Sequence, residues 1–219
     1  MRLLILGGTG PSGIALIRKA LEVYPEGTVV AYARSPEKIP EDLQANALVV
    51  IIKGTLEELD KVEQALDAVD AVVSALGPLP NQPPGNPIAT FYGHLIELLY
   101  KHRILRFLAL ATASHPDPHD KPSWKFAALV TGVRTLARNA YSEIVAIGQV
   151  VTTKGKDLDY TIVRVPFLTN AETENVVAGY IGDAKIGMIL TRKAYAAFCI
   201  AELEKREWVK TAPMICNAA

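Results

Sequence analysis

The chain has 219 residues, half of them hydrophobic, which is enough for one large domain with a sizeable core. Basic and acidic residues number 23 each, so no basic field attracts nucleic acid and no acidic tail is present. Apolar runs are only as long as strands, which argues against a membrane span. The first predicted strand starts at residue 2, leaving no room for a signal peptide, and we expect a cytoplasmic protein. Cys199 and Cys216 lack disulfide-scaffold and metal-site spacing, so we expect packing roles and no metal.

Strand and helix patterns alternate along most of the chain. Buried strands are predicted at 2–6, 28–33, 47–52, 70–75, 105–111 and 159–165, and helices at 12–24, 57–67, 87–102, 123–139, 141–154 and 192–206. This alternation predicts an α/β fold with a doubly wound, mostly parallel (Rossmann) sheet covered on both faces. We expect a single domain over 1–219, whose less regular tail, about 167–219, forms a small substrate-side extension. Within it, 208–216 is a last strand or an extended wrap.

The first predicted strand runs directly into a glycine-rich loop and a helix. The spacing of Gly7, Gly10 and Gly13 is the G-x-x-G-x-x-G form of the dinucleotide-binding fingerprint. The three glycines permit a tight turn, a close approach to a pyrophosphate and a close contact of the helix with the sheet. The helix start, with Ser12 as its expected N-cap, then presents free N–H groups to the phosphates. We predict cofactor contacts from Gly7, Thr9, Gly10, Pro11, Ser12 and Gly13.

The end of the second strand indicates which dinucleotide binds. A site that prefers NAD usually carries Asp or Glu there, and this chain has Arg34 followed by Ser35. The guanidinium of Arg34 suits a 2′-phosphate, and Ser35 adds a hydroxyl donor. The alternative is that Arg34 is an ordinary solvated arginine. The pattern favours NADP(H) as the cofactor.

The ends of the third and fourth strands supply further predicted cofactor contacts. Thr55 and Leu56 would lie under the adenine, although Thr55 is also the expected N-cap of the next helix, in a capping box with Glu58. Small residues follow the fourth strand and would leave space for the ribose: Ser74, Ala75, Leu76 and Gly77.

Two proline-rich segments interrupt the alternation, 77–87 and 112–122. Both leave the carboxyl ends of predicted strands, and in an open α/β sheet this edge holds the ligand crevice. They are either rigid connectors or overhangs of the crevice, and their position favours the second interpretation.

These segments together resemble a known superfamily. The resemblance rests on Gly7-Gly8-Thr9-Gly10-Pro11-Ser12-Gly13, Tyr32-Ala33-Arg34-Ser35, Val73-Ser74-Ala75-Leu76-Gly77, Tyr141-Ser142-Glu143-Ile144-Val145 and Asp159-Tyr160-Thr161-Ile162-Val163-Arg164-Val165-Pro166. Over about residues 1–205 the chain resembles the atypical short-chain dehydrogenase/reductase superfamily. Within it, the chain is similar to single-domain NAD(P)H-binding proteins related to biliverdin-IXβ/flavin reductase and to the nitrogen-metabolite-repression regulators. The resemblance implies a Rossmann fold and a nicotinamide cofactor, and says little about the reaction.

The chain departs from the orthodox members at their proton donor. Those members use Tyr-x-x-x-Lys, whereas Tyr141 is followed four residues later by Val145. The pair Tyr160 and Arg164 has the right spacing but lies on a predicted strand. The flavin-reductase-like relatives manage with hydride transfer alone and take the proton from solvent.

The fifth strand ends in residues that could contact a substrate. Thr112 and Ser114 are candidates for a hydrogen bond to a substrate carbonyl, and Thr112 also for a contact with the cofactor; His115 is a candidate proton donor near neutral pH. Alternatively, the two hydroxyls only bond the backbone at the strand end, and His115 is an exposed loop residue. Tyr141 is the remaining catalytic candidate, and its alternative role is packing on a helix face. Aromatic residues could line an apolar pocket or pack in the core: Trp124, Phe126 and Phe167.

Three functions are consistent with this pattern. The first is an NADPH-dependent reductase of a small carbonyl-bearing or flat aromatic molecule, of a kind that also occurs in natural-product pathways. The second is an NADP-binding regulator or sensor without turnover, which the missing Tyr-x-x-x-Lys favours. The third is a non-redox isomerase or cyclase on the same scaffold, and fold alone cannot choose among them. The expected partner is a small-molecule substrate, with neither nucleic acid nor membrane, and the oligomeric state is not predicted.

Overall fold

One large sheet organises the computed structural model, which describes residues 1–79 and 81–218. Its order is β3-β2-β1-β4-β5-β6-β10-β8, and a second, two-stranded sheet pairs β7 with β9. In chain order the elements are β1 (Arg2–Leu6), α1 (Pro11–Val23), β2 (Thr28–Ala33), a 3-10 turn (Pro36–Lys38), α2 (Glu41–Gln44), β3 (Val49–Lys53), α3 (Leu59–Ala65), β4 (Ala71–Ser74), α4 (Pro87–Lys101), β5 (Arg106–Thr112), α5 (Trp124–Leu136), α6 (Arg138–Lys154), β6 (Asp159–Val165), β7 (Phe167–Thr169), β8 (Val176–Gly179), β9 (Ile189–Thr191), α7 (Arg192–Lys205) and β10 (Met214–Asn217).

The strand order confirms the predicted doubly wound sheet. Along this order, each strand from β3 at one edge to β10 is parallel to its neighbour. Strand β8, at the other edge, pairs antiparallel with β10. The order reverses between β1 and β4, so the crevice of the fold opens beyond the carboxyl ends of these two strands. Of the two predictions for 208–216, the last strand is correct, since β10 joins the sheet beside β6.

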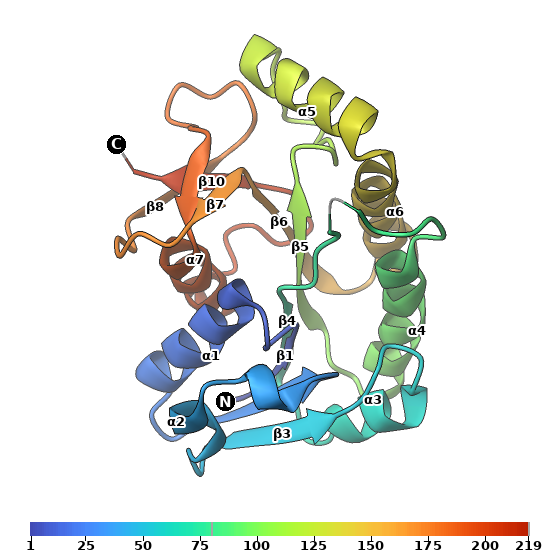
Figure 1. Cartoon of the computed structure of the whole chain (residues 1–219), viewed down its shortest axis with the longest axis vertical. Coiled ribbons are helices and arrows are strands. Elements are labelled where there is room, and N and C mark those ends of the chain that lie inside the picture. The colour runs from blue at the N-terminus through green and yellow to red at the C-terminus, as the bar shows by residue number, and fades with distance from the viewer. Residues whose placement is uncertain (80, 219) are drawn as a thin grey trace.

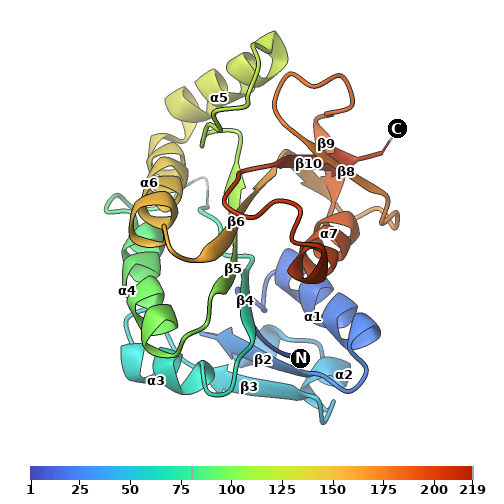
Figure 2. The same ribbon diagram turned by 180° about the vertical axis from the view of Figure 1, so that it is seen from behind.

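Helices cover both faces of the sheet, as Figures 1 and 2 show. Helices α1 and α7 lie on one face, and α3, α4 and α6 on the other. Strand β1 shows why: Leu3 and Ile5 point into the first layer, whereas Leu4 and Leu6 point into the second. Because side chains alternate along a strand, a strand buried on both faces must be continuously apolar, as the sequence predicted.

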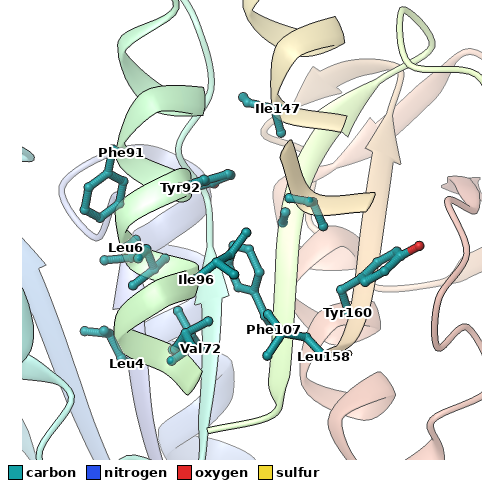
Figure 3. Close-up of a cluster of buried hydrophobic side chains, with 14 of the residues drawn as sticks. Leu4, Leu6, Val72, Phe91, Tyr92, Ile96, Phe107, Ile147, Leu158 and Tyr160 are labelled. Atoms are coloured by element: carbon teal, nitrogen blue, oxygen red, sulfur yellow. The ribbon is translucent and has the colours of Figure 1, made fainter. Parts of the chain in front are cut away.

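The core between the sheet and α4 is built from large, fully buried side chains (Figure 3). Tyr92 on α4 meets Phe107 on β5 edge to face, with ring centroids 5.2 Å apart. The Tyr92 hydroxyl donates to Ser74 Oγ at 2.7 Å, so the polar tip of this buried ring is satisfied. This core fixes the end of β4, from which one wall of the candidate site begins.

The six strands predicted between residues 2 and 165 are all present, with bounds within two residues, whereas the last strand, predicted over 208–216, begins only at Met214. The helices differ as well. The stretch from 123 to 154 breaks at Ala137, whose φ of −136° and ψ of 56° separate α5 from α6. The third helix is shorter than predicted, and α2 was not predicted. The tail adds β7, β8 and β9, of which β7 and β9 pair across some twenty residues of intervening chain.

Candidate functional site

The glycine-rich loop links β1 to α1 at the switch point. Gly7 has φ +77°, and a Cβ there would lie 3.1 Å from the Ala75 carbonyl carbon. A Cβ on Gly13 would lie 2.2 Å from the Gly7 carbonyl oxygen. The protein itself therefore requires glycine at both positions, one for the turn beside β4 and one for the close contact of α1 with the loop.

Gly10 is different, because nothing described in the protein requires it. Its φ of −83° suits any residue, and a Cβ there would meet only the Gly7 oxygen, at 3.6 Å. Gly10 is the N-cap of α1 and Pro11 its first residue, so the expected N-cap role of Ser12 is wrong. The free backbone N–H groups of the first turn and the space left by Gly10 fit a diphosphate.

The predicted adenosine-side residues lie at the same edge of the sheet. Arg34 is exposed at the end of β2, and Ser35 follows it. The neighbouring β3 ends beside them, since Gly54 N–H donates to the Ala33 carbonyl at 3.1 Å. Thr55 and Leu56 come next and are half-buried. The structure thus brings together the two segments predicted to hold the adenosine end.

Thr55 is not a helix N-cap, which corrects the sequence expectation. Helix α3 starts at Leu59, with Glu58 in the N-cap position. Half of the expected capping box remains, because Glu58 Oε2 accepts from Thr55 N–H at 2.8 Å. The Thr55 carbonyl accepts from the hydroxyl of Tyr32 at 2.7 Å, and burial, followed by the charge of Glu58, raises the pKa of Tyr32 to about 12.

Ser74 differs from its neighbours among the predicted cofactor residues. It is fully buried, and its Oγ accepts from Tyr92 and, at 3.2 Å, from Leu76 N–H. Its hydroxyl therefore holds the end of β4 from inside the core. The residues after it leave the core, and Ala75 and Gly77 line a cavity of the crevice.

That cavity has a volume of about 550 Å³ and lies at the carboxyl ends of the central strands. Its lining comes from the start of α1, the segment after β4, the ends of β5 and β6 with the residues that follow them, β7, α5, α6 with the residue between these helices, and the start of α7: Ser12, Ala75, Gly77, Pro78, Leu110, Thr112, Ala113, Ser114, Leu129, Val130, Val133, Ala137, Ala140, Ile144, Val165, Pro166, Phe167, Leu168 and Arg192. It reaches from the α5–α6 layer to the start of α1. A largely apolar cavity with few polar groups is typical of a site for a small organic molecule.

Two of the four predicted catalytic residues line this cavity. Thr112 ends β5, and Ser114 follows after one residue. Ser114 N–H lies 3.3 Å from Thr112 Oγ1, which partly engages the threonine hydroxyl with the backbone. Both residues therefore line the cavity beside the end of β5, where a substrate oxygen could lie.

His115 has a different position. Its ring packs against Gly148 of α6, where a Cβ would lie 2.0 Å from Nδ1, and it is not among the cavity-lining residues described. Burial, followed by the charge of Arg164, lowers the pKa of His115 below its ordinary value. The ring is therefore neutral at physiological pH and serves the contact between the 112–122 loop and α6.

The second proline-rich loop is anchored by a buried ion pair. Arg164 on β6 is fully buried and binds Asp120 through two contacts, of 2.6 and 2.7 Å. The same guanidinium donates to the His115 carbonyl at 3.1 Å.

Asp117 of the same loop is also held by hydrogen bonds. Burial works against ionisation of its carboxyl group, but donors that include the backbone N–H groups of His119 and Ala212 hold its pKa below the ordinary value. Only the first residues of this loop, through Ser114, reach the cavity.

The first proline-rich loop is fastened to the start of α4. Its residues Gly77 and Pro78 line the cavity, whereas Pro80, like Ala219, lies outside the described residues. Glu143 on α6 is fully buried and accepts from the Ala89 N–H at 2.8 Å and from the side chain of Gln82. Its carboxylate thus meets the positive end of α4 and holds the loop.

Tyr141 lies outside the cavity. It lines a separate hollow beside Asn86 and Arg138, whereas Ala140 and Ile144 of α6, and Ala137 just before this helix, line the cavity. Of the aromatic candidates, Phe167 lines the cavity, Phe126 is buried in the core, and Trp124 is 79% exposed.

Several cavity residues were missed by the sequence interpretation. Leu129 and Val133 belong to the helix predicted at 123–139 but were not predicted to line a site. Leu168 and Arg192 come together because β7 and β9 pair, with Leu168 opposite Leu190. The pattern of the predicted helix at 192–206 contains no signal that its first residue borders a cavity.

Comparison with known families decides the classification. Residues 7–206 match the model of the NAD(P)H-binding family. The chain belongs to this family. The match confirms that the chain is an NAD(P)H-binding protein, as the resemblance implied. No curated protein matches the chain in sequence.

Solved structures of low sequence identity share the fold of this family member. A short-chain dehydrogenase/reductase from Veillonella parvula in complex with NADP has TM-score 0.78 and 18% identity, covering 99% of this chain and 94% of that one. A Rossmann-fold NAD(P)-binding family protein from Shigella flexneri has TM-score 0.71 and 18% identity, covering 99% and 93%. An oxidoreductase from Lactococcus lactis has TM-score 0.72 and 19% identity, covering 100% and 91%. Across residues 1–79 and 81–218, no helix has the length and apolar character to cross a membrane.

Proposed function

We propose that the protein is an NADPH-dependent reductase of a small apolar molecule with a carbonyl group or a flat aromatic system. The observation that carries this proposal is the apolar cavity of about 550 Å³ that begins at the first turn of α1 and passes the hydroxyls of Thr112 and Ser114. The NADP complex of the Veillonella parvula protein of the same fold supports the choice of cofactor.

The residues of the chain fit this cofactor from end to end. The α1 start would hold the diphosphate, the exposed Arg34 the 2′-phosphate, and Ala75 and Gly77 would border the nicotinamide end. When bound, the cofactor supplies the hydride. Pro166 and Phe167 also line the cavity and would restrict the pose of a flat ring.

Thr112 and Ser114 orient the substrate in this proposal. A hydroxyl that donates to a carbonyl oxygen stabilises the negative charge that develops there during reduction. The start of α6 presents Ala140 and Ile144 to the cavity, after Ala137 at the helix break, and none of these side chains can donate a proton. In this proposal the proton that completes the reaction comes from solvent.

The test is NADPH oxidation, followed at the nicotinamide absorbance, with a panel of quinones, flavins and aldehydes. We expect turnover with at least one class, and Ser114→Ala to lower kcat/KM about a hundredfold while NADPH affinity is retained. The control is Ser142→Ala, in the separate hollow beside Tyr141. Unchanged kcat/KM in Ser114→Ala would remove the orienting role.

A second candidate function is an NADP-binding sensor without turnover. The apolar α6 wall favours it, because the place of the orthodox proton donor carries no ionisable group. Tight NADPH binding with no oxidation across the whole panel would support the sensor and contradict the reductase.

A further inference from the structure

The lining of the cavity holds a single charged side chain among the described residues, that of Arg192. Arg192 is the first residue of α7 and follows Thr191, whose Oγ1 accepts from Ala194 N–H at 3.0 Å and caps the helix. The helix start is thus fixed in place, and with it the backbone that carries the guanidinium. The other polar lining residues are uncharged hydroxyls.

The charge of Arg192 has no carboxylate partner among the described residues. Its Nη1 donates to Asn170 Oδ1 at 2.6 Å, a neutral amide that orients the guanidinium but does not neutralise it. The acidic residues of the same loop are taken by other cations, Glu172 by Lys193 and Glu174 by Lys19. A planar cation with remaining N–H donors at an apolar cavity is suited to bind an anion.

The cofactor does not need this cation for its diphosphate. The first turn of α1 and the space at Gly10 already provide for that group. Arg192 directly follows β9 in the substrate-side tail, where Phe167 and Leu168 of the same small sheet line the cavity, and it also borders a neighbouring hollow beside Pro11 and Asn170.

One apolar residue of the cavity lining is exposed. Phe167 is 57% exposed, although it is a large aromatic side chain. An exposed aromatic side chain at a cavity suits the apolar body of a ligand.

We infer that the substrate is an amphipathic monoanion, with a carboxylate or similar acidic group held by Arg192 and an apolar body lying between β7 and α5. This inference rests on the proposed function and narrows its substrate class. Arg192 is thus a binding and specificity residue. The reacting group of the substrate lies away from the acidic group, beside Thr112 and Ser114.

The test compares acids with their methyl esters: para-formylbenzoate, naphthoate and decanoate, each titrated by calorimetry into the NADP⁺ complex. At least one acid should bind more tightly than its ester. Arg192→Gln should weaken that acid about tenfold to a hundredfold, leave the ester and NADPH unchanged, and be partly rescued by Arg192→Lys. The matched control is Lys193→Gln, one residue further along α7, paired with Glu172 and not among the cavity-lining residues.

The outcomes separate the inference from the proposed function. If no acid binds better than its ester, or if Arg192→Gln weakens NADPH instead, the inference is wrong, while NADPH oxidation with neutral carbonyls would leave the reductase intact. If an acid binds through Arg192 and no NADPH is oxidised by any carbonyl compound, the inference stands and the reductase falls.

Discussion

At the scale of single residues, Arg34 governs the choice between NADPH and NADH under the proposed function. It is exposed at the end of β2, where a guanidinium can meet the 2′-phosphate that only NADPH carries. We expect Arg34→Ala to raise the Kd of NADPH about tenfold to a hundredfold and that of NADH less than about threefold. Fluorescence titration of both nucleotides measures this, with Arg18→Ala as the control, since Arg18 pairs with Asp42 on the outer side of α1. Equal losses for both nucleotides would remove the 2′-phosphate assignment.

Residues whose role depends on their immediate neighbours in the chain were the ones that could be predicted. Gly7 and Gly13 belong to one short loop, and the turn and the close helix contact that they permit follow from that loop alone. Ser74 and His115 show the opposite case. Tyr92 and Gly148, far from them in sequence, decide that the first hydroxyl is buried and that the second side chain packs against α6.

At the scale of elements, Glu143 links α6, the start of α4 and the first proline-rich loop. Its buried carboxylate accepts from Ala89 N–H and from Gln82, so its removal would leave helix N–H groups without a partner. We expect Glu143→Ala to lower the free energy of unfolding by about 2–3 kcal/mol, measured by urea denaturation. The control is Glu97→Ala on α4, whose carboxylate is exposed and pairs with Lys154. A loss no larger than that of the control would contradict the linking role.

The strands and most helices could be predicted because each is written in a local period of apolar residues. The tail could not, because β7 and β9 are too short for a periodic signal and form only by pairing with each other, Phe167 opposite Ile189. The cavity wall carried by this pairing, including Arg192, was therefore missed. The nucleotide end of the site was accessible to sequence interpretation, and the substrate end largely was not.

At the scale of the whole molecule, His115 makes stability depend on pH. Burial lowers its pKa in the folded state below the ordinary value of 6.5, so below that pH the unfolded chain binds a proton that the folded chain does not. Stability must then fall as the pH falls through this value. We expect His115→Asn to flatten the decline of the free energy of unfolding between about pH 7.5 and about pH 5.5, measured by urea denaturation at each pH.

The control for this pH dependence is His94→Asn on α4, where the side chain is exposed and meets water in the folded and unfolded states alike. The same decline in His115→Asn as in the unaltered protein would show that other groups govern it. Asp117 acts at lower pH. Its folded-state pKa lies below the ordinary value of 3.8, so its contribution is lost only as the pH falls through and below that range.

The break at Ala137 separates helix α5, which forms one wall of the cavity, from α6 and from the packing of the sheet. Helix α5 has Phe126 as its buried residue, and in Figure 1 it extends beyond the end of the sheet, whereas the nucleotide loop is wedged between β4 and the start of α1. Exchanging side chains along α5 can therefore reshape the cavity without disturbing the loop that we propose to hold the diphosphate. Substitutions on α5 can therefore change substrate preference, while the separate glycine-rich loop keeps its affinity for the nucleotide.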